Sequence, residues 1–374
     1  AGLWSLGLLS ALVGMIELAS GTISQTNGLQ LLLFSAGVIF SGLLLVPSAA
    51  YSLGRILGRE IKPPARLSQA LRPSRLIFIL PIVMLLGYWI SGQPNLDWLL
   101  LPPLHVLAIG LPILWLVFIA IHELPTGSPQ RAWGLFGSGI VIAPGLSFII
   151  EFAALIMVAI LGILAISASP GLTEELTLLV ERLEPTPPSP EIVTEALAPY
   201  LSNPVVIFTV FTFAAVLVPL IEELIKPVGA WLLIGYNPAP VEGFVAGVLS
   251  GAGYALVESL ALTSPGQTWA AIVFARIGTG VVHIFTAGLV GWALALAWQE
   301  NRYLRLGVTY LVAVLIHGLW NALTLVTVGA TLSDLHVSYT NTELMTQLGR
   351  IAPGILIGLA IGSFIGLLWA NRSF

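Results

Sequence analysis

Long apolar stretches with few charged residues follow one another along nearly the whole chain. They predict helices at residues 3–21, 28–48, 76–92, 97–121, 134–168, 204–236, 241–263, 269–298, 306–328 and 351–370. Most of these stretches reach the ~20 residues that a helix needs to cross ~30 Å of hydrocarbon. The polar–apolar alternation of strands is absent, which excludes a β-barrel. We therefore predict an all-α, polytopic transmembrane helix bundle with about ten spans.

Composition supports the same fold class. Of the 374 residues, 57 % are hydrophobic and 9 % are charged, whereas soluble domains are roughly 45–50 % apolar and about 25 % charged. We expect an integral protein of a prokaryotic cell membrane, with the lipid bilayer as its surroundings. The net charge of −4, with no basic patch beyond one loop, argues against nucleic acid as a partner. The absence of cysteine excludes disulfides, thiolate metal sites and a cysteine nucleophile.

The first apolar stretch lacks a basic leading segment and a small-residue cleavage site, so we interpret it as a span and not as a signal peptide. The loops predict the orientation. Loop 49–75 is rich in Lys and Arg against the single Glu60, a bias typical of cytoplasmic loops. When ten spans are counted, further basic residues fall on the same side: Arg131, Arg302, Arg305 and Arg372. Both termini are therefore predicted to be cytoplasmic.

The acidic, proline-rich connection 169–203 predicts a boundary between modules. Leucine and valine recur at helical spacing before its prolines, and a second amphipathic stretch follows them. We interpret it as an external linker with amphipathic helices, and a lid over the second half is the alternative. The predicted modules are an N-terminal accessory transmembrane module at 1–168, this linker at 169–203, a core at 204–328, and an external loop with the last transmembrane helix at 329–374.

Ionisable residues inside the predicted spans of the second half form one set: Glu222, Glu223, Glu258, His283 and His317. A charged group at membrane depth costs at least ~2.5 kcal/mol, so it persists there mainly when it is paired, hydrated or functional. Carboxylates and imidazoles can both bind a metal or transfer protons. This set is therefore the candidate site.

Glu222 and Lys226 are four residues apart, on one face of their predicted helix, whereas Glu223 points about 100° away. Lys226 can therefore neutralise Glu222 and keep it ionised. A purely structural ion pair is the alternative, but such a pair would need only one glutamate.

The next two predicted helices carry the rest of the set on defined faces. Tyr254 and Glu258 share one face, and Arg276 and His283, two turns apart, share another. Glycines before Glu258 permit close helix packing, although small residues at this spacing are common in membrane helices.

His317 and Asn321 share a face of the following predicted helix. Asn321 can donate a hydrogen bond to an oxyanion, while His317 can bind a metal or also donate. The remaining ionisable residues in or near spans have no shared spacing, and we interpret them as local structural groups: Glu17, His105, His122, Glu123 and Glu151. His122-Glu123 begins like a zinc-protease HExxH motif, but Thr126 occupies the second histidine position.

Together these blocks resemble the PrsW-type intramembrane proteases, distant relatives of the CAAX prenyl endopeptidases and bacteriocin-immunity membrane proteases. The resemblance covers roughly residues 204–328 and lies in four blocks, Glu222-Glu223-x-x-Lys226, Tyr254…Glu258, His283…Gly288 and His317-x-x-x-Asn321. The aromatic position is usually Phe in the family, so Tyr254 departs mildly. The resemblance implies hydrolysis of a peptide bond in a membrane-anchored protein substrate.

Two mechanisms are open for such a protease. In a zinc-dependent one, His283, His317 and Glu258 would bind the metal, with Glu222 or Glu223 as general base. In a metal-free one, a glutamate near a histidine deprotonates water, and His317 and Asn321 form the oxyanion hole. Repulsion among three carboxylates in one low-dielectric site favours zinc.

Two other functions compete with proteolysis. A proton- or cation-coupled transporter would also use Glu and His residues at mid-membrane, but the inverted repeats expected of many transporters are not evident. A catalytically silent scaffold or immunity factor is disfavoured because no position of the four blocks is degraded. The substrate sequence and the oligomeric state are not encoded in any of these patterns.

Overall fold

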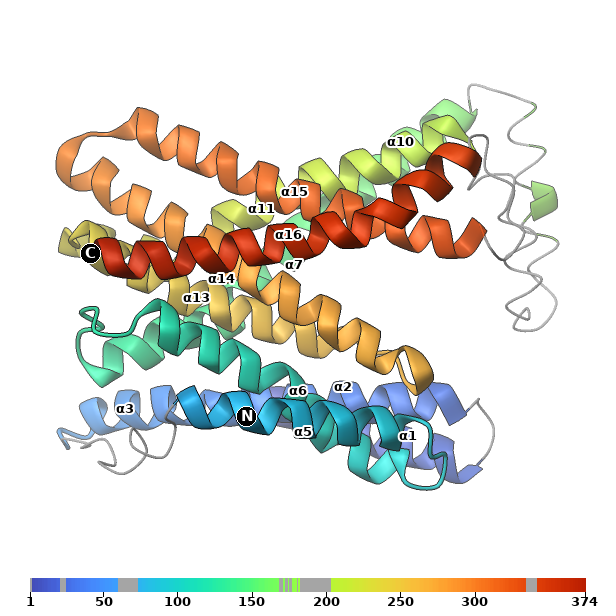
Figure 1. Cartoon of the computed structure of the whole chain (residues 1–374), viewed down its shortest axis with the longest axis horizontal. Helices are drawn as coiled ribbons and strands as arrows, with labels where there is room; N and C mark the ends of the chain where they lie inside the picture. The colour runs from blue at the N-terminus through green and yellow to red at the C-terminus, as the bar shows by residue number, and fades with distance from the viewer. Residues whose placement is uncertain are drawn as a thin grey trace. The chain divides into compact units, whose positions relative to one another are not determined.

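In the computed structural model, the described residues are 2–20, 25–59, 73–167, 203–333 and 342–374, with isolated positions between 171 and 181. These residues form helices, and no strand occurs among them (Figure 1). Within the described part, eight helices are long and apolar enough to cross a membrane, and Ser5–Ile16 and Phe78–Ser91 are shorter apolar helices. The predicted all-α transmembrane fold is confirmed. The span count and the orientation of the termini stay predictions.

Nine of the predicted stretches correspond to α1 (Gly2–Ser20), α2 (Gln25–Leu44), α5 (Pro73–Ser91), α6 (Asp97–Ala120), α7 (Pro129–Ser167), α13 (Pro240–Ala261), α14 (Trp269–Glu300), α15 (Tyr303–Ser333) and α16 (Thr342–Ser373). The tenth, 204–236, is a series of short elements: α10 (Pro204–Thr212), the π-helix η1 (Phe213–Leu217), α11 (Val218–Ile225), α12 (Val228–Trp231) and the 3₁₀-helix η2 (Ile234–Tyr236).

Three predicted connections differ from expectation or lie partly outside the described residues. The start of loop 49–75 is helical, because α3 (Val46–Ile56) continues the preceding span with a proline in its first turn. Most of the linker 169–203 and residues 334–341 of the last loop lie outside the described residues.

The chain divides into two compact units, each assembled from separate segments. The first unit contains residues 1–145, 223–313 and 360–374. Its centre is the pair α13 and α14, which lie side by side and carry most of the fully buried residues (Figure 1). Helix α6 packs against both.

Glycines allow the backbones of the first unit to approach closely. A Cβ atom at Gly247 of α13 would overlap the carbonyl oxygen of Ala287 in α14. A Cβ atom at Gly139 of α7 would overlap the carbonyl oxygen of Ser250 in α13. Small residues let membrane helices gain van der Waals contact along their backbones, so α13 is fixed on two sides.

The second unit contains residues 146–222 and 314–359. Here α15 contacts the π-helix η1, which ends two residues before Pro219. A proline removes the N–H that a regular helix would offer to residue 215, and a local π-turn is one way a membrane helix adapts. Gly318 brings α15 close to the Ala215 carbonyl oxygen, and the Asn321 side-chain amide donates to the Ala214 carbonyl oxygen at 2.9 Å.

Candidate active site

A helix break at Pro227 places the first functional residues. Helix α11 ends at Ile225, and α12 begins after Pro227, which has no N–H to continue the helical ladder. Side chains from elsewhere bind carbonyl groups around the break. Ser250 Oγ donates to the Lys226 carbonyl oxygen at 2.7 Å, and Trp231 Nε1 donates to that of Leu224 at 2.9 Å. The backbone at Lys226 is therefore held by α13.

The Lys226 side chain is fully buried in the first unit. Its ammonium group lies 2.9 Å from Glu223 Oε1 and 2.9 Å from His283 Nδ1. It also lies 5.2 Å from the centre of the Tyr254 ring, and the same ring meets His283 edge-on. Spacing alone favoured Glu222 as the partner of Lys226, whereas the structure gives it an ion pair with Glu223, three residues away.

Glu258 continues this chain of contacts. One of its oxygens lies 2.7 Å from His283 Nε2, and the other lies 3.0 Å from Arg276 Nη2. Arg276 Nε also donates to Ser259 Oγ at 3.2 Å. The predicted common face of Arg276 and His283 is confirmed, because both side chains reach the same carboxylate.

These contacts define the tautomer of His283. A protonated Lys226 has only donors, so Nδ1 of His283 must accept from it. The proton of the neutral ring then lies on Nε2, which donates to Glu258. Lys226 therefore assigns the two ring nitrogens of His283 opposite roles.

Formal charge balances within this group. Glu223 and Glu258 contribute two negative charges, and Lys226 and Arg276 contribute two positive ones, while His283 is neutral in the tautomer just described. Burial is uneven: the Glu223 side chain is 0 % exposed, whereas that of Glu258 is 36 % exposed. The Glu258 carboxylate is therefore the exposed end of this group.

The second unit holds a separate pair. Glu222 Oε2 lies 3.8 Å from His317 Nε2, and the two side chains are 8 % and 2 % exposed. Asn321, one turn after His317, binds the Ala214 carbonyl oxygen and so fixes α15 against the segment that leads into α11. In this conformation Asn321 thus has a structural contact, and its predicted oxyanion role stays a prediction.

The donors of both units suit a divalent metal in type. Imidazole nitrogen and carboxylate oxygen are usual zinc ligands, and two of them on one zinc lie about 3.4 Å apart at the tetrahedral angle. The 3.8 Å between Glu222 Oε2 and His317 Nε2 is close to that spacing. His283 could bind a metal only after Nε2 lost its proton, because Nδ1 already accepts from Lys226.

Other predicted local groups have structural contacts. His105 is buried in α6, where Nδ1 accepts from Trp269 Nε1 at 3.2 Å. His122 and Glu123 form an exposed pair at 3.8 Å. Sequence analysis missed Ser250 and Ser259 as supports of the site. Ser250 lies one turn before Tyr254, and Ser259 directly follows Glu258. Their contacts with Lys226 and Arg276 could not be predicted, because they depend on how the neighbouring segments pack against α13.

Residues 128–345 match the model of a protein family described as PrsW family intramembrane metalloprotease. The matched region contains every residue of the two groups described above, and it extends beyond the segment 204–328 on which the resemblance rested. No curated protein and no solved structure matches the chain.

Proposed function

Because the chain belongs to the PrsW family of intramembrane metalloproteases, we propose that it hydrolyses a peptide bond in a membrane-anchored protein, with Glu222 and His317 acting on the reacting groups. The main support for this proposal is that the buried side chains of Glu222 and His317 lie close together, with 3.8 Å between Oε2 and Nε2. A carboxylate beside an imidazole can take a proton from water and deliver it to the departing amine. The family match favours this function over the transporter.

The contacts of the other two glutamates support positioning roles for them. The charges of Glu223 and Glu258 are compensated by Lys226 and Arg276. Glu258 also uses both oxygens, one toward Arg276 and one toward His283. Sequence analysis favoured Glu258 as a metal ligand, but these contacts favour a positioning role for it, with Glu222 as the carboxylate that meets water or metal.

Chain continuity supports joint action of the two groups. Glu222 and Glu223 are consecutive residues of α11, so the reacting pair and the Lys226 group share one short helix. We propose that Lys226 and Glu258 hold the His283 ring, and that His283, His317 and Asn321 face the carbonyl group under attack. In the hydrolysis, water adds to that carbonyl carbon, Glu222 takes the proton, and the C–N bond breaks as the amine receives it.

Zinc is our proposed metal, with His283 and His317 among its ligands and Glu222 kept as the general base. When bound, it would supply Lewis acidity toward the carbonyl oxygen and make water more acidic. The His283 tautomer gives a test that does not depend on activity. Zinc binding must release the Nε2 proton, so calorimetry in buffers of different ionisation enthalpy should show about one proton released and an affinity that rises with pH. Active protein that holds no transition metal and ignores strong chelators would leave the metal-free mechanism.

The position of Glu258 along α13 supports cleavage in the extracytoplasmic half of the membrane. Glu242, in the first turn of α13, pairs with Arg131 at 2.7 Å, on the side predicted to be cytoplasmic. Glu258 lies sixteen residues further on, which corresponds to about 24 Å of helix. The group around Glu258 is thus far from the basic end of α13 and close to its other end.

The decisive experiment is cleavage of a model transmembrane substrate by purified protein in lipid nanodiscs. We expect Glu222→Gln and His317→Ala to lower the rate by at least about 100-fold, the lower range for general acid–base groups, with unchanged thermal unfolding. Glu123→Gln and His122→Ala are the matched controls, because both side chains are exposed, at 86 % and 51 %. Full activity of folded Glu222→Gln would overturn the assignment.

A further inference from the structure

A pocket of about 600 Å³ opens in the first unit, between the end of α3 and the start of α7. Its lining includes three guanidinium groups, from Arg55, Arg59 and Arg131, and the hydroxyl groups of Ser48, Ser52 and Ser128. No carboxylate belongs to the lining residues. The pocket is therefore rich in donors and positively charged.

Only one of the three arginines has an ion-pair partner among the described residues. Arg131 Nη1 binds Glu242 Oε1 at 2.7 Å, whereas no described carboxylate lies within ion-pair distance of Arg55 or Arg59. Two positive charges thus remain to attract an anion. Arginine binds phosphate oxygens with paired, charge-assisted hydrogen bonds.

The walls of the pocket are held in place. Ser48 Oγ, in α3, donates to the Trp133 carbonyl oxygen in α7 at 2.6 Å, which ties the two helices together. Ser128 Oγ accepts from the Arg131 backbone N–H at 3.2 Å and caps α7. The first turn of this long helix therefore borders the pocket, and its dipole adds to the attraction of an anion.

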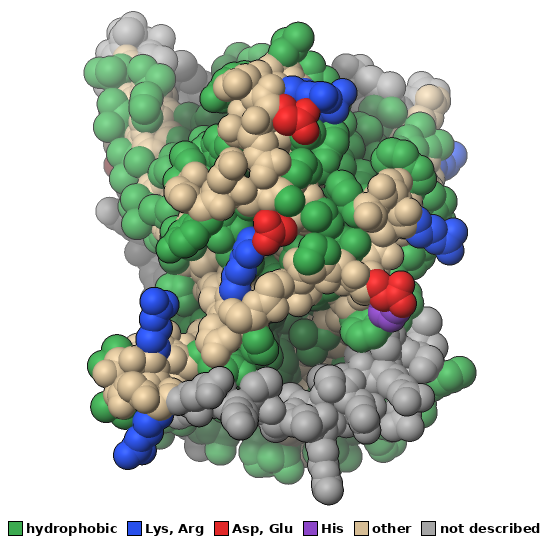
Figure 2. Space-filling view, turned by 90° about the vertical axis from the view of Figure 1, so that its left-hand side faces the viewer, with side chains coloured by type: hydrophobic (Ala, Val, Ile, Leu, Met, Phe, Trp, Pro, Cys, Tyr) green, Lys and Arg blue, Asp and Glu red, His purple; other side chains and the backbone are tan. Residues whose placement is uncertain are grey.

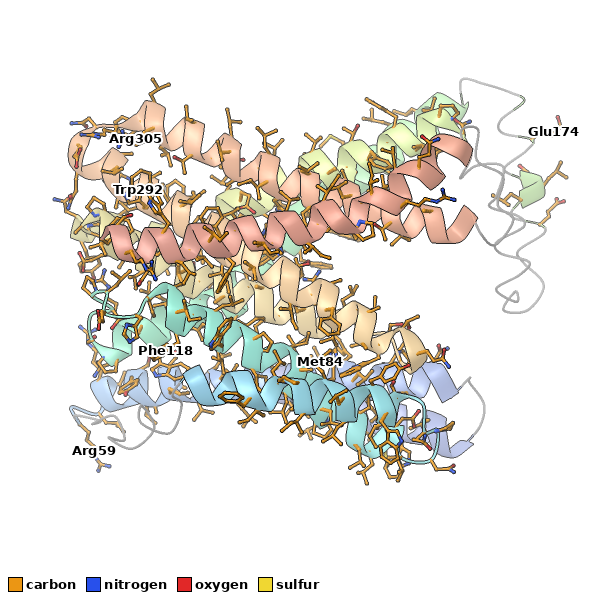
Figure 3. The ribbon with its side chains drawn as sticks, viewed as in Figure 1. Arg59, Met84, Phe118, Glu174, Trp292 and Arg305 are labelled. Atoms are coloured by element: carbon orange, nitrogen blue, oxygen red, sulfur yellow. The ribbon has the colours of Figure 1, made fainter. Side chains whose placement is uncertain are left out.

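Apolar side chains beside the arginines place the pocket at the membrane surface. Leu53, Ile56 and Leu57, around the end of α3, are 56 %, 80 % and 57 % exposed. Leucine and isoleucine so exposed next to arginines are typical of a helix at the lipid–water interface. Figure 3 shows Arg59 at the same end of this unit as Arg305, and Figure 2 shows Lys and Arg side chains among apolar surface on that face.

We propose that this pocket binds the phosphate group of an anionic membrane lipid, with Arg55 and Arg59 as its principal ligands. The exposed leucine and isoleucine side chains would contact the acyl chains, while Ser52 and the first turn of α7 donate to the phosphate. Basic pockets on the cytoplasmic side of helix bundles are suited to such headgroups. None of the glutamates and histidines proposed for catalysis lines this pocket.

The test uses full-length protein in detergent, titrated with phosphatidylglycerol or phosphatidylcholine and followed by native mass spectrometry and thermal unfolding. We expect phosphatidylglycerol to bind and raise the unfolding temperature, and phosphatidylcholine to do so far less. Arg55→Gln with Arg59→Gln should weaken phosphatidylglycerol binding by roughly tenfold or more. Arg55→Lys with Arg59→Lys keeps the charge but loses the paired hydrogen bonds, and should give an intermediate loss.

The charge-matched control is Arg302→Gln with Arg305→Gln, which removes two charges outside the pocket. Arg302 pairs with Glu300, and Arg305 lies over the Trp292 ring. If the control and the pocket variant lose phosphatidylglycerol binding equally, the lipid is attracted by overall positive charge and not by this pocket, which would overturn the site. Equal stabilisation by glycerol 3-phosphate or inorganic phosphate would overturn the assignment to a lipid. If the Gln variant does not fold, undiminished binding by the Lys variant would also overturn it.

Discussion

The ring of His283 is held from both sides, by Lys226 at Nδ1 and by Glu258 at Nε2. Such a ring has one orientation and one tautomer, and both depend on Lys226 being charged. The charge of Lys226 in turn depends on Glu223, because the ammonium group is fully buried. At this scale the functional unit is thus a chain of contacts and not a single catalytic side chain.

Removing Lys226 alone should be more harmful than removing the pair. Lys226→Met removes the ion pair of the buried Glu223 carboxylate, and breaking a buried pair in this way costs about 3–5 kcal/mol. Lys226→Met with Glu223→Gln should recover most of that stability, measured by reversible unfolding in detergent. Cleavage should not recover, since His283 lacks its donor. Equal unfolding free energies for the single and double variants would contradict the buried pair.

Helix–helix contact in the first unit depends on single glycines of α13. An alanine at an exposed helical glycine stabilises a helix by about 1 kcal/mol, and Gly307 of α15 has no heavy atom near its added Cβ. At Gly247 the added Cβ would overlap the Ala287 carbonyl oxygen of α14.

We therefore expect Gly307→Ala to be neutral or stabilising, and Gly247→Ala to lower the unfolding free energy by about 1–3 kcal/mol. Because α13 carries Glu258 and α14 carries His283, Gly247→Ala should also lower cleavage. Thermal unfolding of both variants separates two effects. Gly307→Ala reports the change in helix propensity, and Gly247→Ala adds to it the loss of helix packing. A stabilised Gly247→Ala protein would disprove the close contact of α13 and α14.

Hydrophobic pattern alone predicted the positions of the helices well, because apolar stretches of span length dominate this chain. It could not predict that the stretch 204–236 contains a π-helix before Pro219, since a π-turn has no periodicity of its own. It could not choose between Glu222 and Glu223 as partner of Lys226. Spacings of three and four residues both bring side chains together on a helix, and the neighbouring helices decide between them. The four sequence blocks nevertheless contain the glutamates, the histidines and the lysine of the two groups, whereas Arg276 lies outside them.

For the whole molecule, the predicted division into an accessory half and a protease core stays a prediction. If it holds, Glu17→Gln, His105→Ala and Glu151→Gln should each retain cleavage, measured on the same transmembrane substrate. His105→Ala should lower stability, because the ring accepts a hydrogen bond from the buried Trp269. A folded variant among the three with no cleavage would show that the boundary was misplaced.

The contacts of α11 also have a consequence for how the protein is made. Glu223 and Lys226 are three residues apart, so their ion pair can form locally as this segment enters the bilayer. Glu222 meets His317, which lies about 95 residues later in the chain. At about 5–20 residues per second, Glu222 is synthesised roughly 5–20 s before its histidine. During biogenesis this glutamate must therefore stay protonated, hydrated or bound by the insertion machinery until α15 arrives.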